Sequence, residues 1–280
     1  APLGWIAVAI PAIMLSYYCD IGGWVLRYAL VYAEGRGEEA ANAHFTAANG
    51  VEISFFDQFI SGNIEPVIYF IVFLMITTGV IMFGVQKGIE KAGKIMMPML
   101  LVMMVVLAIY MFTLDGASGG LKYYLFPEFT GFTLKRFFET FKAAFGQMFY
   151  SIGIAVGTLL TYGAYMRKED SLEAAVHQIE IIDTGVAFLA GLIIIPSVFV
   201  FSKGDSSVLN SGAGLMFITM PKVFASLPGG EIIGLVFFVF VIFAALTSSI
   251  AIMEAVVYSV MERLGTGRIK SCLIDRKSVV

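Results

Sequence analysis

Polar residues inside long apolar runs are the part of this sequence most able to do chemistry. The run at 144–166 contains Tyr150, Ser151 and several glycines at membrane depth. Glycines four positions apart, such as Gly153 and Gly157, let two helices approach closely. The same residues also fit a discontinuous helix, whose unwound backbone groups line a substrate and ion cavity. Both interpretations stay open on these residues alone.

A hydroxyl triplet lies in the run at 231–261, where Thr247, Ser248 and Ser249 are consecutive. Three neighbours cannot share one face of a helix at about 100° per residue. The carbonyl of Ala244 precedes Thr247 by three positions and Ser248 by four, so these three oxygens can meet on one side. Oxygen ligands of this kind suit a hard cation such as sodium better than a transition metal. The alternative is that each hydroxyl bonds the carbonyl one turn back in its own helix.

A carboxylate, Asp183, stands at the start of the run at 181–202. Inside the hydrocarbon an ionisable side chain is expensive and predicts a functional site. At the end of a helix the same residue can be an N-cap. The two histidines and two cysteines are isolated from one another, so neither a metal cluster nor a disulfide framework is expected.

The composition places these groups in a membrane. Of the 280 residues 59% are apolar and 14% charged, and the mean hydropathy is +0.87. A soluble domain carries roughly a quarter charged residues, because it must cover its surface. The net charge of −3 gives no basic face for nucleic acid.

Six runs are long enough to cross a bilayer, which needs roughly 17–25 apolar residues. They lie at about 5–31, 66–84, 94–114, 144–166, 181–202 and 231–261. Spans of this length must be helices to satisfy their own backbone, and the short alternating segments of a membrane barrel are not evident. We therefore predict an all-α, polytopic transmembrane bundle.

The connections suggest an orientation and two further elements. Basic residues gather in the loops after the second, fourth and sixth spans, so these loops should face the cytoplasm and the first span should run from inside to outside. Residues 133–142 read as an amphipathic helix at the interface. Residues 206–229, rich in glycine and proline, suggest an external broken hairpin. We assign 1–264 to one membrane domain and 265–280 to a cytoplasmic tail.

These segments, in this order, resemble the neurotransmitter:sodium symporter family in its bacterial amino-acid-transporting branch. The resemblance covers about 1–264 and corresponds to family helices three to eight. The stretches that carry it are Ser16-Tyr17-Tyr18 with Gly23-Trp24, Lys87-Gly88-Ile89-Glu90-Lys91 with Met97-Pro98, Gly146-Gln147-Met148-Phe149, Thr161-Tyr162-Gly163-Ala164-Tyr165, Ala190-Gly191, Phe217-Ile218-Thr219-Met220-Pro221 and Leu246-Thr247-Ser248-Ser249-Ile250-Ala251-Ile252-Met253.

The resemblance implies an inverted-repeat transporter fold in which family helices one and six are broken at the midplane. The run at 144–166 would be the broken helix six, with unwinding around Gly153 to Gly157. Family helices one, two and nine onward are missing from this chain, so the chain alone should transport nothing.

The resemblance also implies a substrate site. Tyr18 would hydrogen-bond the substrate carboxylate, and Tyr150, where the family usually has Phe, would close the site from outside. The residues around the substrate side chain would be Met14, Gly153, Val156, Ser249 and Ile252. Gly153 and Val156 stand where larger residues are often found, so a bulky apolar or aromatic amino acid is expected.

Two sodium sites are implied as well. One would use the carbonyl of Ala244 with Thr247 and Ser248. The other would use Ser151 and Asp183 together with the substrate carboxylate. In chloride-dependent relatives the position of Asp183 is Asn, with Ser at the position of Ala187, so chloride should not be required here.

The predicted function is therefore sodium-coupled symport of an amino acid by a multi-pass protein of the bacterial cytoplasmic (inner) membrane, with no catalytic residues. A membrane-embedded enzyme would need a nucleophile, a carboxylate pair or histidine ligands near one interface. A non-transporting sensor or a channel on the same fold is the third possibility, and a channel should show a ring of polar groups or a filter loop.

Overall fold

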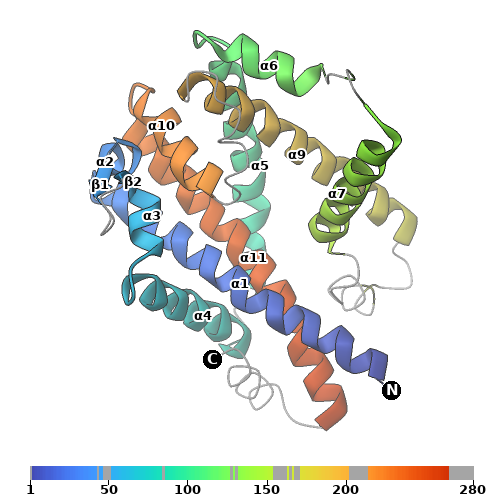
Figure 1. Cartoon of the computed structure of the whole chain (residues 1–280). Helices are drawn as coiled ribbons and strands as arrows, with labels where there is room; N and C mark the ends of the chain where they lie inside the picture. The colour runs from blue at the N-terminus through green and yellow to red at the C-terminus, as the bar shows by residue number, and fades with distance from the viewer. Residues whose placement is uncertain are drawn as a thin grey trace.

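The computed structural model is a bundle of long helices that cross one another at varied angles (Figure 1). It describes residues 2–42, 44–46, 52–83, 86–126, 129, 132–153, 163, 166, 171–201 and 214–264. The elements are α1 (Pro2–Ala33), α2 (Gly37–Asn42), β1 (His44–Thr46), β2 (Glu52–Ser54), α3 (Phe55–Ile60), α4 (Glu65–Phe83), α5 (Gln86–Met111), α6 (Ala117–Leu125), α7 (Leu134–Ile152), α9 (Leu172–Phe201), the π-helix η2 (Leu215–Thr219), α10 (Met220–Ala225) and α11 (Gly230–Leu264).

The predicted all-α bundle is confirmed, with one small addition. The strands β1 and β2, of three residues each, form an antiparallel hairpin in the loop after α2. Four helices are long and apolar enough to cross a membrane, at 65–82, 93–111, 172–201 and 230–257. A fifth, α1, is 32 residues long, and α7 carries the first half of the fourth expected span.

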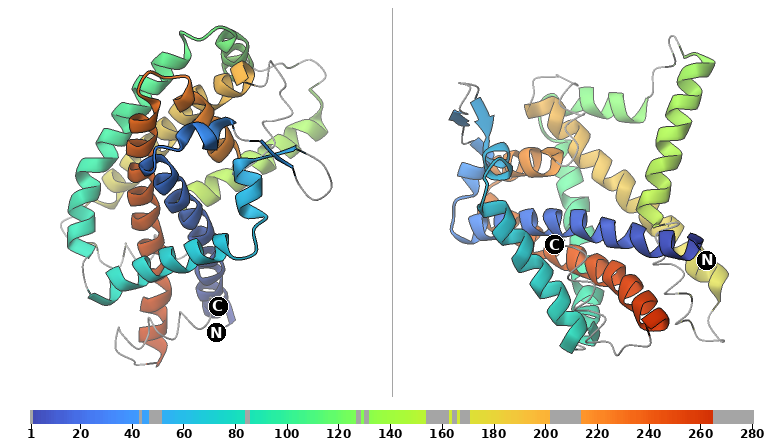
Figure 2. Two further views of the ribbon diagram at one scale, coloured as in Figure 1. Left: turned by 90° about the vertical axis from the view of Figure 1, so that its left-hand side faces the viewer. Right: turned by 60° about the horizontal axis from the view of Figure 1, so that its bottom comes forward.

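The helices α1 and α11 form the centre of the bundle and run antiparallel, side by side (Figures 1 and 2). Tyr32 lies against Gly234 at one end of the pair, and Tyr18 lies beside Ser248 nearer the other. The helix α4 packs on the other side of α1. Gly23 permits that approach, because a Cβ built there would lie 2.9 Å from the backbone nitrogen of Phe70.

Two buried clusters fill this centre. The larger is aromatic and surrounds Tyr28, Phe217 and Phe238, where α1, α3, η2 and α11 meet. The smaller is aliphatic and includes Leu15, Phe73 and Met253 from α1, α4 and α11. Because all these side chains come from segments far apart in the chain, the packing fixes how the helices that carry the candidate site lie relative to one another.

The helix α7 stands apart on the right of Figure 1 and packs mainly against α9. The amphipathic helix expected at 133–142 is the first part of α7, which continues from Leu134 to Ile152 into the fourth expected span. Phenylalanines at 137, 141, 145 and 149 contact one another every four residues across the expected junction. Gly146 is the only interruption there, and one glycine costs a helix only about 1 kcal/mol.

Two other boundaries differ from the sequence expectation. The helix α9 begins at Leu172 rather than 181, where the Ser171 hydroxyl accepts from the backbone of Ala174. The helix α5 begins at Gln86 and includes Pro98. In both cases a polar first part joins an apolar span without a break, so a hydropathy boundary is not a helix boundary. The expected hairpin at 206–229 is described only from 214, where η2 and α10 form its second arm.

Candidate functional site

The end of α7 meets the middle of α9 through one short hydrogen bond. The helix ends at Ile152 because Gly153 adopts φ 72° and ψ 28°, a left-handed conformation that favours glycine. One residue before this end, the hydroxyl of Ser151 donates to Asp183 Oδ1 at 2.7 Å. The helix therefore ends where the discontinuous-helix interpretation expects the unwinding to begin. Val156 and the rest of the expected unwinding, from 154 onward, lie outside the described residues.

Asp183 is not an N-cap, because α9 begins eleven residues before it at Leu172. It therefore lies in the interior of a membrane-spanning helix, half-buried, and Ser151 comes to it from another helix. A carboxylate at such a position is costly unless a partner or a cation compensates its charge. The carboxylate and hydroxyl oxygens are ligands that suit a hard cation.

The hydroxyl triplet divides between two sides of α11. On the first side, the hydroxyl of Thr247 donates to the carbonyl of Ala244 at 2.9 Å. Ser248, the next residue, is close enough to the hydroxyl of Tyr18 on α1 to interact with it. The Ala244 carbonyl and the side chains of Thr247 and Ser248 are all half-buried. This geometry is compatible with both interpretations of the triplet. Thr247 bonds the carbonyl one turn back, and the oxygens of Ala244, Thr247 and Ser248 still lie on one side of α11.

The second side of α11 faces α4. Ser249 is fully buried, and its hydroxyl lies 3.0 Å from that of Thr77 and 3.0 Å from the carbonyl of Leu246. Ile252 is buried in the aliphatic cluster between α1, α4 and α11. Of the residues expected around the substrate side chain, these two are engaged in helix packing here.

Thr77 was not among the residues that the sequence analysis expected near the site. The signal that could have revealed it is the pair Thr77-Thr78 at the middle of the span at 66–84. Thr78 satisfies its own hydroxyl by donating to the carbonyl of Leu74 at 2.7 Å. Thr77 instead reaches across to Ser249 and joins α4 to α11.

Tyr150 lies between the two parts of the candidate site in the sequence of helices. Its side chain, on the last full turn of α7, is within electrostatic range of Tyr17 and Tyr18 on α1. The direct contacts are two separate pairs, Ser151 with Asp183 and Tyr18 with Ser248. Met14 lies one turn before Tyr18 on α1 and is half-buried.

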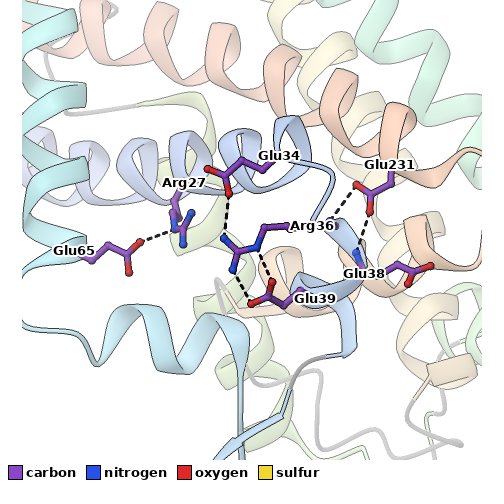
Figure 3. A network of polar contacts seen from close by, with 8 residues as sticks. Arg27, Glu34, Arg36, Glu38, Glu39, Glu65 and Glu231 are labelled. Atoms are coloured by element: carbon purple, nitrogen blue, oxygen red, sulfur yellow. Dashed lines mark hydrogen bonds and ion pairs between the residues drawn. The ribbon is translucent and has the colours of Figure 1, made fainter.

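Charged side chains gather at the opposite end of α1, near α2 and α4 (Figure 3). Arg27 Nε lies 2.7 Å from Glu65 Oε1. Arg36 holds Glu39 through two bonds, of 2.7 and 2.8 Å, and reaches Glu34 at 3.1 Å. These bonds from Arg36 lower the pKa of Glu39 and raise that of Arg36.

Two hydrogen bonds join the start of α2 to Glu231 in the first turn of α11. The carboxylate of Glu231 accepts from the backbone N–H groups of Gly37 and Glu38, at 3.1 and 3.2 Å. A carboxylate is a favourable partner for the unpaired amides at the start of a helix. A glycine suits this position, since a Cβ built on Gly37 would overlap the ring of Tyr32.

Comparison with known proteins gives this geometry its context. The family model described as the sodium:neurotransmitter symporter family matches residues 40–277. The sodium-dependent transporter YhdH of Bacillus subtilis is 34% identical over 257 residues, which are 92% of this chain and 54% of that protein. A sodium-dependent transporter of Methanocaldococcus jannaschii is 30% identical over 96% of this chain and 55% of its own length.

A solved structure agrees with the fold. MhsT, crystallised in complex with L-phenylalanine, superposes with a TM-score of 0.87 and 32% identity, over 99% of this chain and 60% of that protein. The chain thus spans little more than half the length of the relatives it matches. Because the family model matches most of the residues, and several helices are apolar enough to span a bilayer, this multi-pass membrane protein belongs to the sodium:neurotransmitter symporter family, which consists of sodium-dependent transporters and not of enzymes.

Proposed function

We propose that this chain is the central part of a longer protein that carries an amino acid across the bacterial cytoplasmic membrane together with sodium. The observation that carries the proposal is the bond from Ser151 to Asp183 at the end of α7. It brings a hydroxyl of α7 and a carboxylate of α9 together where α7 ends, so that a desolvated cation can be stabilised there.

Two sodium sites belong to the proposal. Ser151 and Asp183 form the first, with the substrate carboxylate as a further ligand. The Ala244 carbonyl, Thr247 and Ser248 form the second. The contact from Thr247 to Ala244 supports the second site, because it holds two of its three oxygens 2.9 Å apart before any ion arrives.

The proposed substrate is a bulky apolar or aromatic amino acid. Tyr18 would donate its hydroxyl to the substrate carboxylate, and Tyr150 would cover the substrate from the outer side. Gly153 supports a large substrate because it projects no side chain into the space beyond the end of α7. The complex of MhsT with L-phenylalanine, from a protein 32% identical to this chain, supports the same class.

The coupling is proposed to be independent of chloride. The carboxylate of Asp183 supplies a fixed negative charge next to the first sodium site. Ala187, one turn later on α9, offers no hydroxyl with which to bind an anion. Uptake should therefore persist when external chloride is replaced by gluconate.

The remaining part of the proposal concerns the whole protein. The relatives are nearly twice as long as this chain, so helices before α1 and after α11 would complete both sodium sites. In the proposed orientation the ends of α1 and α4 that carry Arg27 and Glu65 face the outside.

Uptake of radiolabelled amino acids by the full-length protein in proteoliposomes tests the proposal. Leucine or phenylalanine should accumulate under an inward sodium gradient and not when potassium replaces sodium. Glycine should compete weakly with either one. A purified, folded protein that binds these amino acids without accumulating them would instead be a non-transporting sensor.

A further inference from the structure

A cavity of about 700 Å³ lies at the proposed outer end of α1, between α3, α4 and the β1–β2 hairpin. This volume is within the range of small-molecule sites, roughly 300–1,000 Å³. It is lined by Arg27, Arg36, Glu39, Phe55, Phe59 and Glu65, among others. None of these residues belongs to the candidate transport site.

The charged residues of the cavity balance. Two guanidinium groups, of Arg27 and Arg36, stand against two carboxylates, of Glu39 and Glu65. A lining with no net charge favours a ligand that carries one charge of each sign over an anion or a cation alone. Three aromatic rings, of Phe45, Phe55 and Phe59, also line the cavity and would accept an apolar neighbour.

Arg27 is a charged group of this cavity whose buried Nε makes no hydrogen bond. Its side chain is only 13% exposed, with the guanidinium 5.7 Å from the ring centre of Phe55 and 5.9 Å from that of Tyr69. Its Nε lies 2.7 Å from Glu65 Oε1, yet the buried N–H does not point at this oxygen and makes no hydrogen bond. A buried donor without a hydrogen bond is costly, and an arriving acceptor would be stabilised.

An exposed apolar face of α4 begins at this cavity. Ile68, Val72 and Ile76 follow Glu65 at three, seven and eleven positions, so they lie on the same side of the helix. Ile68 is 52% exposed, Ile76 is 38% exposed and Val72 is half-buried. The charged cavity and the apolar stripe are thus continuous at one end of a membrane-spanning helix, where headgroups meet acyl chains.

We propose that this cavity binds the headgroup of one phosphatidylethanolamine molecule, with an acyl chain along Ile68, Val72 and Ile76. The phosphate accepts from Arg27 and Arg36, and the ammonium donates to Glu65 and Glu39. A choline headgroup has no N–H to donate to these carboxylates, and a glycerol headgroup leaves the lipid anionic. Both should therefore bind more weakly. Which leaflet the lipid comes from depends on the proposed orientation of the protein, whereas the binding itself does not.

Native mass spectrometry of the full-length protein tests this. The detergent-purified protein would be titrated with phosphatidylethanolamine, phosphatidylcholine or phosphatidylglycerol of matched chains. We expect one saturable phosphatidylethanolamine adduct, and a roughly tenfold weaker one for Arg36→Gln or Glu65→Gln, as for the loss of a charge-assisted contact. Arg27→Lys, which keeps the charge and removes the planar fork, should weaken it as well.

Arg136→Gln is the matched control, because it removes an exposed arginine of α7 and should leave the adduct unchanged. The proposal is overturned if the three lipids bind equally, if phosphatidylglycerol binds best, or if the cavity variants retain the adduct while remaining monodisperse. Sodium-driven uptake is not the readout, so a protein that fails to transport can still pass or fail this test.

Discussion

Removing the hydroxyl of Ser151 is the most direct test of the site at the end of α7. In the structure this hydroxyl donates to Asp183 Oδ1 at 2.7 Å, which is a short, charge-assisted bond. Such bonds contribute about 1.5–3 kcal/mol. When sodium binds between the two oxygens, the hydrogen bond from Ser151 to Asp183 is lost. The net loss of sodium affinity in Ser151→Ala is therefore the free energy of one sodium ligand minus that of this hydrogen bond.

The partial exposure of the pair places the expected loss at the lower end of that range. About 1.5 kcal/mol corresponds to a roughly tenfold higher sodium concentration for half-maximal uptake. The assay is sodium-activated uptake by the full-length protein in proteoliposomes, with the Ser151→Ala, Asp183→Asn and double variants compared. Because both residues would act on one ion, the double variant should lose less than the two single effects combined, by about 1 kcal/mol or more.

Ser118→Ala, at an exposed serine of α6, is the control and should leave sodium activation unchanged. Strictly additive effects of the two substitutions would show that Ser151 and Asp183 do not share an ion. A shift of less than twofold in Ser151→Ala, with normal expression and thermal stability, would refute the assignment of its hydroxyl to sodium.

Three further outcomes are expected. Gly23→Ala should destabilise the protein by about 1–3 kcal/mol, because its Cβ would meet backbone atoms of α4; Gly79→Ala, where a Cβ meets nothing within 4 Å, should not, and thermal unfolding in detergent compares the two. Thr77→Val should cost only about 0.6–1 kcal/mol in the same measurement, since its serine partner keeps a second bond, to a backbone carbonyl; a larger loss would mean that this pair holds α4 to α11. Arg36→Gln should lower the melting temperature near pH 7 and not near pH 3: the pKa of Glu39 is lowered in the folded protein, so the pair stabilises above the unfolded pKa of about 4.3 and the stabilisation is lost as the pH falls through the lowered value.

The membrane bundle and its helix order could be predicted because apolar runs of this length have one solution in a bilayer. The continuity of α7 with its span and the start of α9 could not, since the first turns of both helices are polar and helical at once. Hydropathy reports where a chain meets lipid, whereas the helix begins wherever a cap such as Ser171 satisfies its first amides.

Within the candidate site, the sequence predicts which residues have useful oxygens but not which way each one points. The hydroxyls of Ser248 and Ser249 differ by one residue, and the structure turns the first toward α1 and the second toward α4. Only tertiary packing, through Gly23 and the buried aromatic cluster, decides that rotation. For the same reason the ion pair of Arg27 and Glu65 could not be predicted, because the two residues are 38 positions apart.

Because α7 is continuous from Leu134 to Ile152, it would tilt as one rigid rod. Its 19 residues extend for roughly 28 Å at 1.5 Å per residue. The left-handed residue Gly153, at its C-terminal end, is a suitable pivot point. A tilt of only 10° about that point would move the N-terminal end of α7 by about 5 Å, close to the rise of one helical turn. Ser151, next to the pivot, would stay close to Asp183. A small rearrangement at the Ser151–Asp183 hydrogen bond and a large displacement at the protein surface would then result from one rigid movement.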